Sequence, residues 1–163
     1  MRSAFLMAFI LNIGLNLCSL LLLPETVAIH FSRGGRPDDW ASKEMHVLLM
    51  ILVDGLVFLP LYFAPRLFGR VPPRYLSLPY KQYWLRAENR RQVKSMLSQL
   101  MSEFGCALYG FLFGTALLAL EANRSVPVRL DEPLFIIFLA IFLVYTIVWT
   151  IRLVVRLRPP GQT

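Results

Sequence analysis

Four long apolar stretches constrain this chain more than any other feature. They cover about residues 4–23, 46–63, 100–120 and 134–155, and each is long enough to cross a hydrocarbon core roughly 30 Å thick as a helix. Lipid offers the backbone no hydrogen-bond partners, so each stretch must satisfy its own N–H and C=O groups, which favours helices. The sequence therefore predicts an all-α fold, an integral membrane four-helix bundle forming a single membrane domain over residues 1–163.

The composition excludes most other classes of protein. Hydrophobic residues make up 56% of the chain and charged residues only 17%, whereas soluble domains carry about 25% charged residues. Disordered chains have low hydrophobicity, so this composition also excludes a disordered chain. Two cysteines are too few for a disulfide scaffold or a thiolate zinc site. The chain has no sequence pattern of a catalytic triad, a phosphate-binding loop or a zinc protease. We therefore expect no enzyme, no cofactor and no bound metal.

The basic residues predict one orientation in the membrane. Most of the 17 lie at Arg2, in the loop 66–99 and in the segment that begins at Arg152. Because Lys and Arg favour the cytoplasmic side, we expect both termini in the cytoplasm of a bacterium, with loops 24–45 and 121–133 outside its inner membrane. Juxtamembrane basic charge meets anionic lipid headgroups, so the expected partner is the lipid bilayer and not nucleic acid.

The outer loop 24–45 has the pattern of a structured, extracytoplasmic cap. Val27, Ile29 and Phe31 alternate with smaller or polar residues, which predicts a short strand. Gly34-Gly35 supplies one turn, and we expect Arg36-Pro37-Asp38 to form a second.

Six residues of this loop are candidates for binding a partner. In one interpretation His30 acts with neighbouring carboxylates to bind a cation or a peptide; in the other it only orders the loop. An aromatic ring at position 40 also suits the headgroup level of a membrane. The candidates are His30, Phe31, Asp38, Asp39, Trp40 and Lys43.

The spacing of apolar and basic residues in the cytoplasmic loop 66–99 predicts a basic amphipathic helix just before the third span. Val93, Leu97 and Leu100 repeat at helical spacing, whereas Arg91 and Lys94 fall on the other face. We expect this helix to lie against the inner leaflet or to pack beneath the bundle.

Three polar residues lie deep within the first two spans. An ionised carboxylate at the depth of Asp54 costs several kcal/mol unless it is paired. Asn12 and Asn16 share one helical face, and in an antiparallel hairpin Asn16 reaches nearly the depth of Asp54. We predict that this cluster joins the first two spans, either as a hydrogen-bonding clamp or as a proton- or ion-linked site.

A stripe of small residues runs along one face of the third span. Ser102, Cys106, Gly110 and Gly114 repeat every four residues, which favours close helix packing or a homo-oligomer. Glu103, one turn inside the cytoplasmic face, is expected to reach back toward Lys94 or Gln99.

Two motifs carry a family resemblance. They are Leu23-Pro24…Ile29-His30-Phe31…Gly35…Asp38-Asp39-Trp40…Ser42-Lys43, placed after a first membrane helix, and Leu78-Pro79-Tyr80-Lys81-Gln82-Tyr83-Trp84-Leu85. The chain resembles a bacterial membrane family of unknown function, found at the N-terminus of SdpI-type immunity proteins. Those proteins protect a cell from its own sporulation-delaying toxin, and they are longer by about two helices. The resemblance implies no enzymatic activity.

Three hypotheses for function follow. The first is a sensor, immunity or accessory protein that recognises a peptide or membrane-protein partner through residues 24–45. The second is a small transporter or ion-coupled subunit that uses the Asn12, Asn16 and Asp54 cluster. The third, a lipid-acting enzyme with His30 and either Asp38 or Asp39 near the headgroups, lacks a recognisable catalytic pattern.

Overall fold

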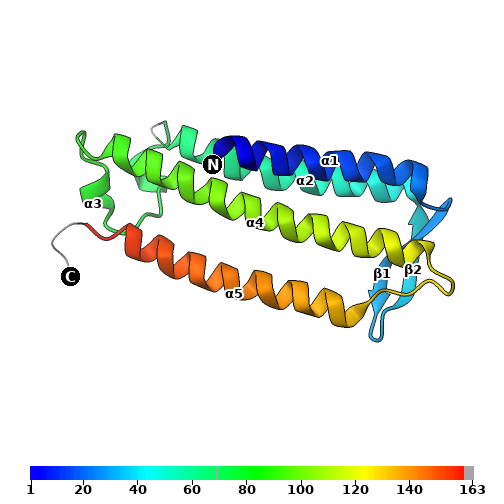
Figure 1. The fold of residues 1–163 in the computed structure, drawn as a ribbon. Helices are drawn as coiled ribbons and strands as arrows, with labels where there is room; N and C mark the ends of the chain where they lie inside the picture. The colour runs from blue at the N-terminus through cyan, green and yellow to red at the C-terminus, as the bar shows by residue number, and fades with distance from the viewer. Residues whose placement is uncertain (69, 160–163) are drawn as a thin grey trace.

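The structure, a computed structural model, describes residues 1–68 and 70–159. Four long helices run back and forth along one axis (Figure 1). Each is long and apolar enough to cross a membrane, which confirms the predicted multi-pass helical architecture. The four are α1 (Arg2–Leu22), α2 (Lys43–Leu67), α4 (Arg90–Arg124) and α5 (Glu132–Arg156).

The bundle has two distinct ends. A β-hairpin and the connection between α4 and α5 lie at one end, which we call the hairpin end (Figure 1). The start of α1, the end of α5 and the short helix α3 (Lys81–Trp84) lie at the other, which we call the terminal end. Loop 24–45 and the α4–α5 connection therefore share one end of the bundle, as four crossings require.

Three of the helices form the packed centre of the bundle. α1, α2 and α4 contact one another, and α5 packs on α4. Phe5 of α1 is fully buried, with its ring centroid 5.3 Å from that of Phe58 and 5.8 Å from that of Tyr109. A side chain at Gly105 of α4 would overlap the Phe5 ring, so this glycine permits the close approach of α1 and α4.

The loop between α1 and α2 forms a two-stranded antiparallel hairpin, which corrects the all-α prediction. Strand β1 (Thr26–Ser32) covers the predicted strand, but β2 (Arg36–Ser42) occupies the place where a second turn was expected. The charged sequence of β2 has no apolar alternation; it is extended because it pairs with β1. Pro37 is tolerated because a two-stranded ribbon leaves one edge of each strand without a partner. Gly34 and Gly35 form the turn, with φ of +82° and +71°.

The second motif folds beneath the bundle at the terminal end. Trp84 is 2% exposed and packs in a cluster with Phe68, Val93 and Leu157. Its Nε1 donates a hydrogen bond to the Leu157 carbonyl oxygen over 2.8 Å. The motif thus ties the end of α5 to the first turns of α4, and α4 itself is one continuous helix of 35 residues that includes the amphipathic segment.

Candidate functional site

A cavity of about 410 Å³ lies beneath the hairpin. Its walls come from α1, β1, α2, α4 and the start of α5, and its volume falls within the range of small-molecule sites, roughly 300–1,000 Å³. The cavity joins two sets of residues that the sequence placed in separate hypotheses. His30 and Phe31 of the hairpin line it together with Asn12, Asn16 and Asp54 of the bundle.

The floor of the cavity is a buried polar network that joins three helices. Asn16 Nδ2 donates to Asp54 Oδ2 over 2.9 Å, and the two residues are 6% and 3% exposed. Asn12 Nδ2 donates to the carbonyl oxygen of Tyr109 over 3.1 Å, and the Tyr109 hydroxyl donates to the backbone oxygen of Asp54 over 2.6 Å. The structure thus brings together all three predicted residues and adds Tyr109, which sequence reasoning missed.

The roof of the cavity is fixed to α4 by one side chain. Asn123 Oδ1 accepts from the Ala28 N–H over 2.6 Å, and its Nδ2 donates to the Ala28 carbonyl oxygen over 3.1 Å. Asn123 is 4% exposed and Ala28 1% exposed. Because the Asn123 amide bonds both the backbone N–H and the backbone carbonyl oxygen of Ala28, it holds β1 in place over the cavity.

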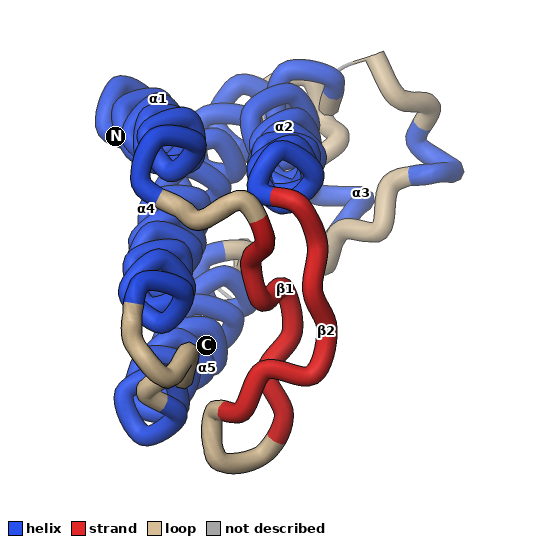
Figure 2. Tube along the Cα trace, turned by 90° about the vertical axis from the view of Figure 1, so that its right-hand side faces the viewer, coloured by secondary structure: helices blue, strands red, loops and turns tan. Residues whose placement is uncertain are grey.

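The tip of the hairpin is anchored to the connection between α4 and α5 and to the first residue of α5. The Gly34 N–H donates to Glu132 Oε2 over 2.6 Å, and Arg129 Nε donates to the Gly34 carbonyl oxygen over 3.1 Å. The Leu130 N–H donates to the Gly35 carbonyl oxygen over 2.9 Å. Figure 2, which looks onto the hairpin end, shows the hairpin running from the end of α1 and the start of α2 toward the start of α5.

The candidate partner-binding residues of the hairpin fall into different environments. His30 Nδ1 lies 2.6 Å from Asp38 Oδ1, and both side chains are largely exposed, so His30 pairs across the strands. Asp39 Oδ1 accepts from the Trp40 N–H over 2.9 Å, and Trp40 is 46% exposed. Lys43 forms an ion pair with an exposed glutamate at the base of the hairpin. Among the described residues, no three His, Cys, Asp or Glu side chains gather as a metal site would require.

The stripe of small residues on α4 contributes unevenly to packing. A side chain at Gly114 would come within 2.8 Å of the Phe138 ring of α5, whereas Gly110 has open space around it. Ser102 is buried and bonds within its own helix, and Cys106 is half-buried.

Glu103 on α4 makes polar contacts both with α5 and within its own helix. Arg152 Nη1 lies 3.1 Å from Glu103 Oε2, and Gln99 Nε2 donates to Glu103 Oε1 over 2.9 Å. Of the two partners expected for Glu103, the structure thus gives it Gln99 and not Lys94. Arg152, in the last turns of α5, is the partner that the sequence did not indicate. The Tyr145 hydroxyl adds a bond of 3.3 Å to the Glu103 carbonyl oxygen.

Comparison with known proteins adds one finding. Residues 7–53 match the family model of a domain of unknown function, DUF1648. The matched segment covers most of α1, the whole hairpin and the part of α2 that ends one residue before Asp54. No curated protein and no solved structure matches the chain. The match supports the resemblance to a membrane domain family of unknown function, and it includes most of the cavity's roof and part of its floor.

Proposed function

We propose that this chain is a multi-pass protein of a bacterial cytoplasmic membrane that recognises a peptide or protein partner at its hairpin end. The observation that carries the proposal is the cavity with the hairpin as its roof and the Asn16–Asp54 pair as its floor. A site of this kind presents two surfaces to one partner, the exposed strands outside and the cavity within.

The chemistry of the cavity favours a partner with an apolar group and a hydrogen-bond donor. Ile29, Met50, Val53 and Phe135 supply apolar wall, while Asn16 occupies one of the two carboxylate oxygens of Asp54. The second oxygen is the acceptor that a ligand amide or ammonium group would use. A volume of about 410 Å³ suits one or two side chains or a chain end, so the rest of a peptide would lie on the hairpin.

The proposed orientation places the hairpin outside the cell. Its support is the concentration of Lys and Arg at the terminal end, including Arg2, the segment 66–99 and Arg156. The hairpin end would then face secreted peptides, in keeping with the resemblance to the immunity proteins.

Site-directed photocrosslinking tests the proposal. The probe is the labelled sporulation-delaying toxin peptide, the ligand that the resemblance suggests, added to cells that carry a photoreactive phenylalanine in place of Trp40. We expect a crosslink that excess unlabelled peptide suppresses and that Asp54→Asn weakens. A photoreactive residue in place of Leu56, which is 69% exposed on α2, is the matched control. Equal labelling from both positions, or none from position 40, would overturn partner recognition for this peptide.

The position of Asp54 favours a second candidate function, an ion-coupled transporter or subunit. A carboxylate inside the bundle and at the floor of a cavity is the arrangement that proton-linked membrane proteins use. Asp54→Asn keeps an acceptor for Asn16 but cannot ionise. Proton flux into liposomes containing the purified protein, lost in this variant while the protein remains folded, would favour transport over recognition.

A further inference from the structure

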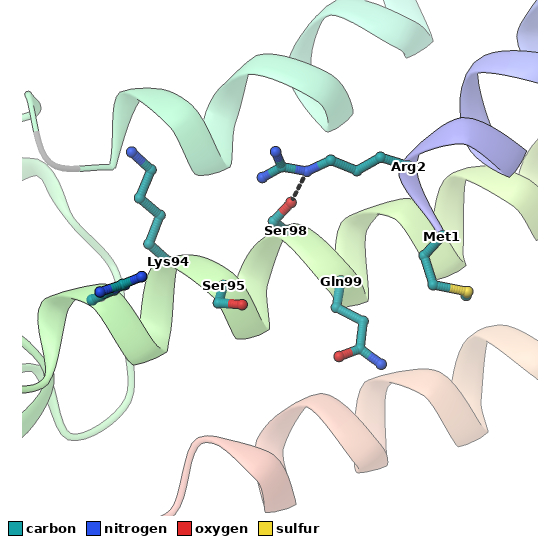
Figure 3. A pocket seen from close by; sticks show the side chains of 7 residues that line it. Met1, Arg2, Lys94, Ser95, Ser98 and Gln99 are labelled. Atoms are coloured by element: carbon teal, nitrogen blue, oxygen red, sulfur yellow. Dashed lines mark hydrogen bonds between the residues drawn. The ribbon is translucent and has the colours of Figure 1, made fainter.

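A second pocket lies at the terminal end, between the start of α1 and the first turns of α4 (Figure 3). Its volume is about 470 Å³, and it is separated from the cavity beneath the hairpin by the length of the bundle. Neither of the two candidate functions proposed above uses it. The polar residues that line it are Arg2, Arg91, Lys94, Ser95, Ser98 and Gln99.

Arg2 is held in this pocket by a specific hydrogen bond. Its Nε donates to Ser98 Oγ over 2.6 Å, and Ser98 is 7% exposed (Figure 3). This bond fixes the guanidinium group at α4, and within residues 1–68 and 70–159 no further hydrogen bond engages its two terminal nitrogens, which can face a ligand. Figure 3 shows Lys94 extending from α4 on the same side of the helix as the Arg2 side chain. Two helices therefore contribute cations to one pocket.

The charge of the pocket is uniformly positive. Arg2, Arg91 and Lys94 line it without any carboxylate. Within the ranges 1–68 and 70–159, none of the three forms an ion pair, and the nearby Glu103 is engaged by Arg152. Glu88 lines an adjoining hollow with Arg91 and is not part of this pocket. Arginine forks and lysine ammonium groups are the usual protein ligands of phosphate.

The depth of the pocket identifies the source of the anion. Arg2 is the first residue of a membrane-spanning helix, so the pocket lies where the hydrocarbon core gives way to the headgroups. We propose that this pocket binds the phosphate of an anionic phospholipid headgroup. Free phosphate shares the same chemistry and is the other source that an experiment must distinguish.

Native mass spectrometry of the purified full chain measures this binding. The probes are phosphatidylglycerol, zwitterionic phosphatidylcholine and inorganic phosphate, each titrated in detergent. Because Arg2→Ala removes a charge-assisted hydrogen bond to the lipid, we expect the affinity for the first bound phosphatidylglycerol molecule to fall by about tenfold. Ser98→Ala removes the bond that fixes Arg2 without changing the charge, so we expect a weakening in the same direction. Arg156→Ala, an exposed cation at the same end but outside the pocket, is the control of equal charge.

The outcomes separate a defined site from diffuse attraction. Selective weakening in Arg2→Ala and Ser98→Ala, with Arg156→Ala unchanged, supports the lipid site. If Arg156→Ala weakens binding as much as Arg2→Ala and Ser98→Ala has no effect, diffuse attraction explains the result and the proposal is overturned. If inorganic phosphate binds in a manner dependent on Arg2 and the lipid does not, the lipid as the source is overturned.

Discussion

Single amide side chains within apolar helices hold the cavity together. Asn123 is the clearest case because one side chain makes both bonds to Ala28. Asn123→Ala removes two buried hydrogen bonds, and at about 1 kcal/mol each we expect a loss of about 2 kcal/mol of stability. Denaturant unfolding of the reconstituted protein measures this loss, and protease cleavage within the hairpin should become faster. Glu121→Ala, an exposed change at the same helix end, should alter neither measurement.

Two substitutions of Asp54 separate its hydrogen-bonding role from its charge. Asp54→Ala leaves the buried Asn16 amide without its acceptor, and we expect a loss of about 1–2 kcal/mol. Asp54→Asn retains an acceptor oxygen and should remain close to the wild type. Thermal unfolding in lipid nanodiscs compares the two variants, with Leu56→Ala as the lipid-exposed control. Equal stability of all three would argue against a hydrogen-bonding clamp at this position.

The sequence anticipated some of these residues and not others. Helix geometry alone places Asn16 at the depth of Asp54, so this pair could be predicted from spacing. Tyr109 and Asn123 bond to backbone carbonyl groups, which every residue has, so no residue type marks their partners. Their signal was only a polar group within an apolar helix.

At the scale of whole elements, the approach of α1 to α4 depends on one glycine. A methyl group at Gly105 would overlap the fully buried Phe5 ring, whereas one at Gly110 would meet open space. We expect Gly105→Ala to cost about 1–3 kcal/mol through overpacking. Gly110→Ala, the same change five residues further along the same helix, should not destabilise the protein. Thermal unfolding of the two variants in the same detergent tests this difference; equal midpoints would contradict the packing.

The elements themselves differed in how well their sequences revealed them. The four spans follow from length and apolarity, which the bilayer imposes on any crossing helix. Strand β2 escaped prediction because its residues are charged and include Pro37, and its extended shape comes from pairing with β1. Gly105 was missed because the four-residue stripe began at Ser102, on a neighbouring face of the helix.

At the scale of the whole molecule, the topology predicts which ends reagents can reach. Trp40 lies at the hairpin end and is 46% exposed, and Tyr75 lies in the segment between α2 and α4 and is 67% exposed. In a chain whose Cys18 and Cys106 are replaced by alanine, we expect Trp40→Cys to react with an impermeant maleimide in intact cells. Tyr75→Cys should react only after the membrane is permeabilised. Reaction of both from the outside would contradict the four-crossing arrangement.

The anchoring of the hairpin has a consequence for exchanging parts between related proteins. The segment that matches DUF1648, residues 7–53, contains the hairpin but not the groups that complete its backbone bonds. Those groups are Asn123 on α4, Arg129 and Leu130 in the connection that follows it, and Glu132 at the start of α5. In a chimera that carries residues 7–53 on an unrelated bundle, the strands and turn of the hairpin would lack these hydrogen-bond acceptors and donors. Transferring the segment 7–53 to another protein therefore requires transferring the residues of α4, α5 and their connection that bond to the hairpin.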